Sequence, residues 1–178
     1  MAYNYYYAGL CFTLQMEGGF VDNPLDPGGA TNRGVTQSVY NTWRKTQNLQ
    51  PQSVALITDQ EVYQLYYTNY WLAGKCDQIP GKIGIVHFDS SVNCGVFQAT
   101  KFLQRAAGVT ADGIIGPATL GTVNSANPDT LAIAYIAQRK SFYDLLVQQD
   151  PSQQVFLTGW DSRLVSLQNL INTIPDNA

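Results

Sequence analysis

Apolar positions recur at helical spacing along most of the chain. In residues 5–17, Leu10, Leu14 and Glu17 follow one another at i, i+4 and i+7, which places them on one face of a first helix. The same period predicts further helices over residues 37–47, 58–72, 82–94, 95–107, 117–124, 129–149 and 160–172. Glycine and proline residues separate these segments. The pattern therefore predicts a mainly α chain.

Residues 20–36 do not follow this helical period. They contain the turn formers Asn23-Pro24 and Asp26-Pro27-Gly28-Gly29, with short β-capable pieces at residues 20–21 and 34–36. This composition predicts a small, irregular β-hairpin directly after the first helix. The fold class expected is mainly α, in the α+β sense: a helical bundle with one β-hairpin.

Charge and residue usage exclude several classes of function. Only 13% of residues are charged, the net charge is −3, and no Lys/Arg cluster offers a nucleic-acid groove. The one histidine and three scattered cysteines form no metal motif, so neither a metal nor a cofactor is expected. The apolar stretches are too short to span a membrane, and the N-terminus lacks a signal-peptide pattern. Cys11 and Cys94 lie in apolar helical contexts, where buried thiols are expected.

The chain has only two glutamates, and they differ in what explains them. Glu61 completes Thr58-Asp59-Gln60-Glu61, which has the form of a capping box. Glu17 stands on the apolar side of its helix near the C-terminal end, where burial and the helix dipole both raise the pKa of a carboxyl group. A protonated carboxyl group is what a general acid requires. The structural alternative is a frayed helix-end residue in solvent.

Asp26 and Thr31 follow Glu17 within the predicted hairpin. If the hairpin folds back over the helix end, the Asp26 carboxylate and the Thr31 hydroxyl face Glu17. Hydrolysis of a glycosidic bond requires one protonated carboxyl group and one ionised group that orients water or stabilises the transition state. The alternative for Asp26 is a turn former before Pro27.

The N-terminal motif carries a family resemblance. Glu17-Gly18-Gly19-Phe20, followed by Asp26-Pro27-Gly28-Gly29-Ala30-Thr31-Asn32-Arg33-Gly34-Val35-Thr36, closely resembles the start of the glycosyl hydrolase 108 family of lysozyme-like N-acetylmuramidases. Individually weaker matches continue at Tyr70-Trp71, Asp77, Phe88-Asp89, Val92-Asn93, Gly95, Leu103-Gln104, Asp112-Gly113, Gly116-Pro117, Thr119, Arg139, Tyr143, Gly159-Trp160 and Arg163. The resemblance covers nearly the whole chain.

The resemblance implies specific roles. Its catalytic glutamate maps onto Glu17, while Phe20 stands where tyrosine is commoner. The order Glu17, Asp26, Thr31 is also similar to that of phage-type lysozymes, in which Glu, Asp and Thr act together with inversion. The Asp-to-Thr gap is one residue shorter here, so the carry-over of Asp26 and Thr31 is less direct.

The second half of the chain, from about Phe88, resembles a predicted peptidoglycan-binding region of this family. Asp112-Gly113-x-x-Gly116-Pro117 is similar to a loop of small peptidoglycan-binding modules, although a glycine turn before a helix with proline at its first position also accounts for it. Because no linker is visible, we expect a single lysozyme-like domain over residues 1–178. Its lobes would be residues 1–87 (catalytic) and 88–175 (helical).

Aromatic rings and neutral amides are the side chains that suit a sugar polymer. Tyr70, Trp71 and Asn93 are therefore candidates for substrate binding, and core packing is the alternative for the two aromatic residues. Arg33 is predicted to pair with Asp26, to bind an acidic substituent, or to remain solvated. His87 has apolar neighbours and is interpreted as a core histidine.

The function predicted is a muramidase that cleaves the β-1,4 bond between N-acetylmuramic acid and N-acetylglucosamine in peptidoglycan glycan strands. The alternatives are a lytic transglycosylase, a non-catalytic peptidoglycan-binding or tail-associated structural protein, and, least favoured, a cysteine peptidase built on His87 with Cys94 or Cys11. We expect synthesis in the cytoplasm and action on the cell wall or periplasm. Holin-dependent release as a phage endolysin and bacterial non-classical export both fit.

Overall fold

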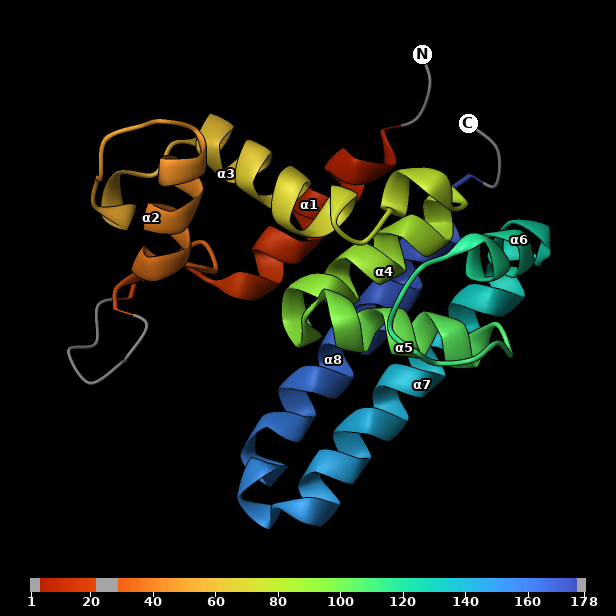
Figure 1. The fold of residues 1–178 in the computed structure, drawn as a ribbon. Helices are drawn as coiled ribbons and strands as arrows, with labels where there is room; N and C mark the ends of the chain where they lie inside the picture. Colours follow the sequence, from red (N-terminus) through yellow and green to blue (C-terminus); the bar gives the residue numbers. More distant parts are fainter. Residues whose placement is uncertain (1–3, 22–28, 176–178) are drawn as a thin grey trace. The chain divides into compact units, whose positions relative to one another are not determined.

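The computed structural model describes residues 4–21 and 29–175, and within them the protein is mainly helical (Figure 1). The predicted fold class, a mainly α chain with a small hairpin after the first helix, is confirmed. The α-helices are α1 (Tyr5–Glu17), α2 (Gln37–Thr46), α3 (Asp59–Tyr66), α4 (Gly81–Cys94), α5 (Val96–Ala106), α6 (Pro117–Ser125), α7 (Pro128–Gln149) and α8 (Gln154–Thr173). Over the described ranges, no helix is both long enough and apolar enough to cross a membrane.

The chain forms two compact units. One, here called the hairpin unit, is Leu10–Asn69; the other, the helical unit, is Met1–Gly9 together with Tyr70–Ala178. Helix α1 and a π-helix, η2 (Tyr67–Leu72), each run from one unit into the other. The predicted single domain with lobes 1–87 and 88–175 stays a prediction.

The sheet of the hairpin unit follows α1 closely. Strands β1 (Thr31–Asn32) and β2 (Val35–Thr36) are antiparallel, with Thr31 opposite Thr36. Arg33 and Gly34 form the turn with positive φ angles of 52° and 74°, the backbone of a tight type I′ hairpin. Glycine at the second position relieves the steric cost of that conformation.

Helices α2 and α3 begin at side-chain caps, and the cap of α3 is the predicted capping box. The Thr36 side chain accepts from the Val39 amide at the start of α2, and Thr58 and Glu61 form the capping box of α3. Glu61 does more than cap, because it also pairs with Arg44 and accepts from the Tyr40 hydroxyl at 2.8 Å. Burial opposes ionisation, but these contacts and the Thr58 amide hold the pKa of Glu61 below its ordinary value. Glu61 therefore ties α3 to α2.

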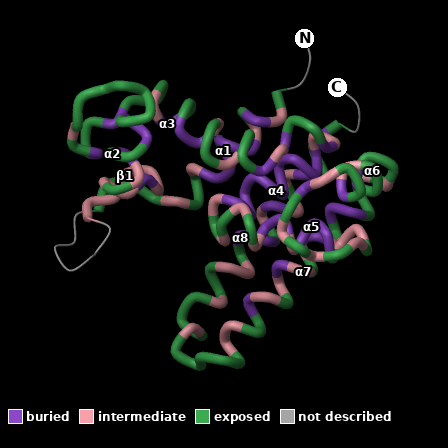
Figure 2. The backbone as a smooth tube through the Cα atoms, viewed as in Figure 1, coloured by how far each residue is buried: buried purple, intermediate pink, exposed green. Residues whose placement is uncertain are grey.

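Helix α4 is the centre of the helical unit. It is buried without interruption from Lys82 to Ser91 and packs against α5, α7 and α8 (Figure 2). His87 lies at its middle, fully buried, with Nδ1 2.8 Å from the Tyr135 hydroxyl. Burial lowers the pKa of His87 to about 4, so the ring is neutral at neutral pH. The prediction of a core histidine is confirmed.

The cysteines do not follow the prediction throughout. All three are free: Cys76 is buried, Cys94 is half-buried, and Cys11 is exposed, so the expected burial of Cys11 was wrong. Burial raises the pKa of Cys94, and its sulfur contacts Asn93 and Tyr143. A thiol kept protonated in this way is a poor nucleophile, which argues against a peptidase built on His87 and Cys94.

Two helix boundaries differ from the pattern. Helix α3 gives way to π-helical turns at Tyr67, inside the predicted single helix, and α8 starts at Gln154 instead of Trp160. Gly159 is exposed and lies within α8, so the helix continues through this glycine. π-Helical turns often mark functional positions.

Candidate active site

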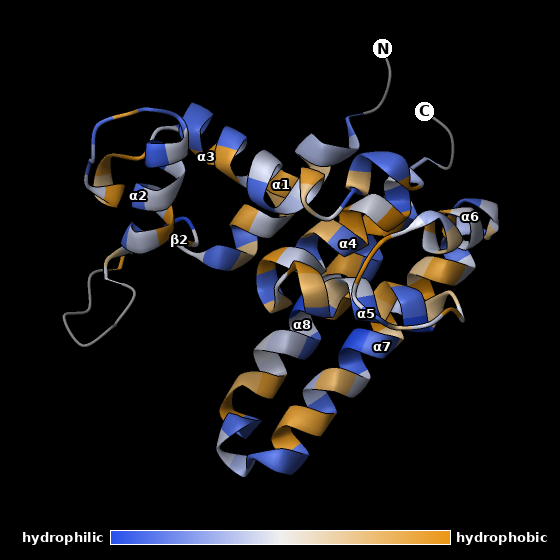
Figure 3. Ribbon diagram, in the orientation of Figure 1, coloured by the Kyte–Doolittle hydropathy of each residue, from blue (hydrophilic) through white to orange (hydrophobic). Residues whose placement is uncertain are grey.

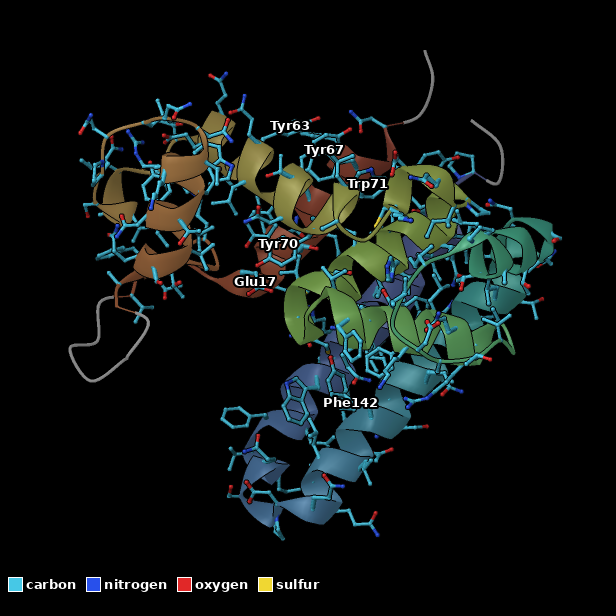
Figure 4. All side chains as sticks on the ribbon, in the orientation of Figure 1. Glu17, Tyr63, Tyr67, Tyr70, Trp71 and Phe142 are labelled. Atoms are coloured by element: carbon cyan, nitrogen blue, oxygen red, sulfur yellow. The ribbon has the colours of Figure 1, made fainter. Side chains whose placement is uncertain are left out.

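Glu17 is the last residue of α1, and the chain turns sharply after it. Gly18 has a φ of 74°, the left-handed conformation with which helices commonly end. The Glu17 side chain is half-exposed and lies against the hairpin turn (Figure 4). A Cβ atom added at Gly34 would stand 2.9 Å from Glu17 Cγ and 2.5 Å from the Tyr66 hydroxyl. Only glycine at position 34 lets the turn approach the Glu17 side chain so closely.

Helix α3 holds the turn in place. The Tyr66 hydroxyl donates to the backbone oxygen of Arg33 at 2.8 Å, and the Arg33 guanidinium pairs with the exposed Asp59 carboxylate. A surface ion pair adds little stability. The hydroxyl of the buried Tyr66 therefore ties the turn to α3. Arg33 has its partner on α3, and its predicted pairing with Asp26 lies outside the described residues.

Thr31 belongs to the same hairpin. Besides its pairing with Thr36, it forms an isolated β-bridge with Val21, whose amide donates to Thr31 O at 2.8 Å and whose oxygen accepts from Thr31 N at 2.7 Å. This bridge joins the two ends of the segment that carries Asp26, which itself lies outside the described residues. The structure thus gathers Glu17, Thr31 and Arg33 on one small framework.

The other candidates for substrate binding, Tyr70, Trp71 and Asn93, belong to the helical unit. Trp71 is only 6% exposed, and its ring packs edge-on against Tyr6 at 5.3 Å between centroids, so it belongs to the core. Tyr70 is half-buried on η2, and Asn93 is exposed at the C-terminal end of α4. Tyr70 and Asn93 are therefore the two of these three residues that reach the surface.

A buried ionic network joins α4, α7 and α8. Asp89 is fully buried and accepts from Arg139 Nη1 at 2.6 Å and from Arg163 Nη2 at 2.7 Å. Burial alone would raise the pKa of Asp89, but the two guanidinium groups outweigh it and the pKa lies below its ordinary value. Arg139 Nε continues the network to the Tyr143 hydroxyl at 2.6 Å.

Sequence reasoning did not assign a site to this network. The helix predicted over residues 129–149 contains Arg139 and Tyr143, and the structure buries both. The family resemblance could have pointed to this network. Its scattered matches include all four residues: Asp89, Arg139, Tyr143 and Arg163.

The glycine-rich loop of the second half is held by one buried glutamine. Gln104 Nε2 donates to Asp112 Oδ1 at 2.7 Å and to Ile114 O at 3.0 Å, and its Oε1 accepts from Gly113 N at 2.8 Å. Pro117 is the first residue of α6, as the turn interpretation predicts. These contacts account for the loop residues structurally, and a surface cavity of about 450 Å³ lies beside them. In the described part of the chain, no three His, Cys, Asp or Glu side chains are grouped as metal ligands.

Comparison with known families identifies the two halves. Residues 10–95 match the family model described as glycosyl hydrolase 108. This part of the chain is similar to that family. Residues 98–165 match the model described as a predicted peptidoglycan domain. The resemblance predicted from the Glu17 motif is therefore confirmed. Within the matched residues, the β1–β2 hairpin is the part that contacts the Glu17 side chain.

One solved structure shows the same fold over almost the full length. The structure of SagA from Brucella abortus has a TM-score of 0.77 and 28% sequence identity, covering 94% of this chain and 93% of that one. No curated protein matches the chain. Together, the two family matches indicate a peptidoglycan hydrolase.

Proposed function

We propose that the protein is a muramidase that hydrolyses the β-1,4 bond between N-acetylmuramic acid and N-acetylglucosamine. The observation that carries this proposal is the position of Glu17. It lies at the end of α1 and against the Gly34 turn, within the residues that match the glycosyl hydrolase 108 model. Glu17 acts as the general acid that protonates the leaving oxygen. The side chain of the chain's other glutamate, Glu61, caps α3 and forms an ion pair with Arg44.

Asp26 and Thr31 complete the proposed mechanism. They hold the water that attacks the anomeric carbon from the face opposite the leaving group, which inverts the configuration. Support comes from the hairpin, because Thr31 stands on the strand that leads to the Glu17-contacting turn. Measuring the anomeric configuration of the first-formed product by NMR tests the inversion.

The test of Glu17 uses the two glutamates as a matched pair. Glu17→Gln should lower the rate of peptidoglycan clearing by at least about 100-fold, the scale of general acid catalysis, with little change in melting temperature. Glu61→Gln should show the opposite behaviour: a lower melting temperature and near-normal activity at a temperature where it is folded. Full residual activity in Glu17→Gln would refute the assignment.

Product analysis separates the remaining alternatives. Mass spectrometry of digested peptidoglycan should show reducing ends from hydrolysis. 1,6-Anhydro ends would instead identify a lytic transglycosylase. Retention on peptidoglycan without any soluble product would identify a non-catalytic binder.

A further inference from the structure

A surface of the helical unit combines exposed aromatic rings with one fixed amide. It is formed by Asn93 at the end of α4 and by Phe156 and Trp160 of α8, and we call it the α4–α8 shelf. Asn93 is exposed, Phe156 is 53% exposed and Trp160 is half-buried. Apolar stretches are visible on both α7 and α8 (Figure 3).

The buried network determines how the Asn93 amide is oriented. Arg139 Nε can only donate, so the Tyr143 oxygen accepts from it, and the Tyr143 hydroxyl hydrogen is free to donate to Asn93 Oδ1 at 2.6 Å. The Cys94 thiol donates to the same oxygen at 3.3 Å. Among the residues that the structure describes, Asn93 Nδ2 donates to no acceptor. The amide therefore offers its N–H groups to a ligand.

The buried ionic network holds Tyr143 in position. Arg139 is fully buried and bound to Asp89, which is also held by Arg163. Because three helices contribute to the network, Tyr143 has little freedom to move, and the Asn93 amide is held in place before any ligand arrives. Such pre-organisation lowers the entropy lost on binding.

Tyr143, which holds the fixed amide, also contacts the aromatic rings of α8. Trp160 stacks on Tyr143 with centroids 4.7 Å apart and an angle of 18° between the planes. Phe156, one helical turn earlier, lies 5.8 Å from Trp160. An aromatic face suits the apolar face of a pyranose ring, and an amide N–H suits the carbonyl of an N-acetyl group.

We propose that the α4–α8 shelf is a saccharide subsite for an N-acetylated amino sugar. Trp160 provides the stacking surface, Asn93 Nδ2 donates to the N-acetyl carbonyl oxygen, and Tyr143 is a positioning residue that acts through Asn93. The identity of the natural ligand as a peptidoglycan glycan strand rests on the proposed function.

The chain contains its own reporter for this subsite. Of its three tryptophans, Trp43 and Trp71 are buried, at 4% and 6% exposure, whereas Trp160 is half-buried. Titration of the Glu17→Gln variant with tri-N-acetylchitotriose should give a saturable change in tryptophan fluorescence and protection from acrylamide quenching. Trp160→Phe should abolish both signals.

Two substitutions test the positioning role. Asn93→Ala and Tyr143→Phe should each raise the dissociation constant about 3- to 10-fold, the scale of one hydrogen bond. The double variant should bind no more weakly than Asn93→Ala, because Tyr143 acts only through that amide. Tyr135→Phe is the matched control: it removes another buried, hydrogen-bonded hydroxyl from α7 and should leave binding unchanged.

The outcomes separate this proposal from the proposed function. Additive effects of Asn93→Ala and Tyr143→Phe overturn the positioning role. An unchanged affinity in Asn93→Ala, or no fluorescence change with both the oligosaccharide and purified glycan strands, overturns the subsite. If the wild type binds but cleaves nothing, the subsite stands and the proposed hydrolysis fails. Asn93→Ala leaves the buried network intact, so the test survives even if Tyr143→Phe does not fold.

Discussion

Acidification should destabilise this protein through one buried side chain, His87. The Tyr135 hydroxyl donates to Ala99 O at 2.8 Å, so it accepts from His87 Nδ1–H, which makes the neutral Nδ1–H tautomer the native form. A second proton would be placed on the buried His87 Nε2, where a contact with the Gly74 backbone compensates only part of the cost of burying the charge. The folded state therefore resists protonation of His87.

The magnitude follows from the two pKa values. Burial lowers the pKa of His87 to about 4, opposed only in part by a backbone contact with Gly74, against 6.5 in the unfolded chain. Between these values the unfolded state binds a proton that the native state does not. Stability is thus fully present above pH 6.5 and is lost as the pH falls toward 4. The total is about 3 kcal/mol, of which about 2 kcal/mol is lost between pH 7.5 and 5.0.

Urea unfolding at pH 7.5 and 5.0 measures this loss directly. The comparison variant is His87→Asn, which keeps a neutral N–H donor close to the Tyr135 hydroxyl but cannot be protonated. It should be less stable than the wild type at pH 7.5 and should lose much less stability on acidification. The native contacts that hold the pKa values of Glu61 and Asp89 below their ordinary values are lost only as the pH falls below those ordinary values, and they affect both proteins equally. Equal losses in wild type and variant would refute the reasoning.

Three further substitutions test other contacts. Gly34→Ala should reduce activity more than about 10-fold and destabilise the fold by about 1–3 kcal/mol, because its Cβ meets Glu17 and Tyr66 at a positive φ; clearing assays and thermal melts measure both. Asp89→Asn should cost about 3–5 kcal/mol in urea unfolding, because it leaves two buried guanidinium groups without their carboxylate. Gln104→Met should cost about 2–3 kcal/mol and raise the hydrogen-exchange rate of the Gly113 amide, whose acceptor it removes. A wild-type exchange rate of the Gly113 amide in that variant would contradict the conclusion that the Gln104 side chain holds the loop.

The sequence by itself determined the parts of this protein that depend on near neighbours in the chain. Helix starts at Thr36 and Thr58, the helix end at Gly18, and the hairpin after α1 were all predicted, because caps and tight turns are satisfied within a few residues. Glu17 stood out for a related reason: only two glutamates exist, and local chemistry explained the other one.

Only the tertiary structure decided which residues of the helices are buried. Helical periodicity marks a face but does not say whether that face meets solvent or another helix. Cys11 was therefore expected inside although it is exposed, and the pattern did not mark Arg139 as buried. Arg139 is buried because Asp89, 50 residues away in the chain, supplies its counter-charge. The approach of the Gly34 turn to Glu17 and the Tyr143–Asn93 hydrogen bond likewise join distant segments. Such pairings depend on how helices pack, and a local pattern does not record them.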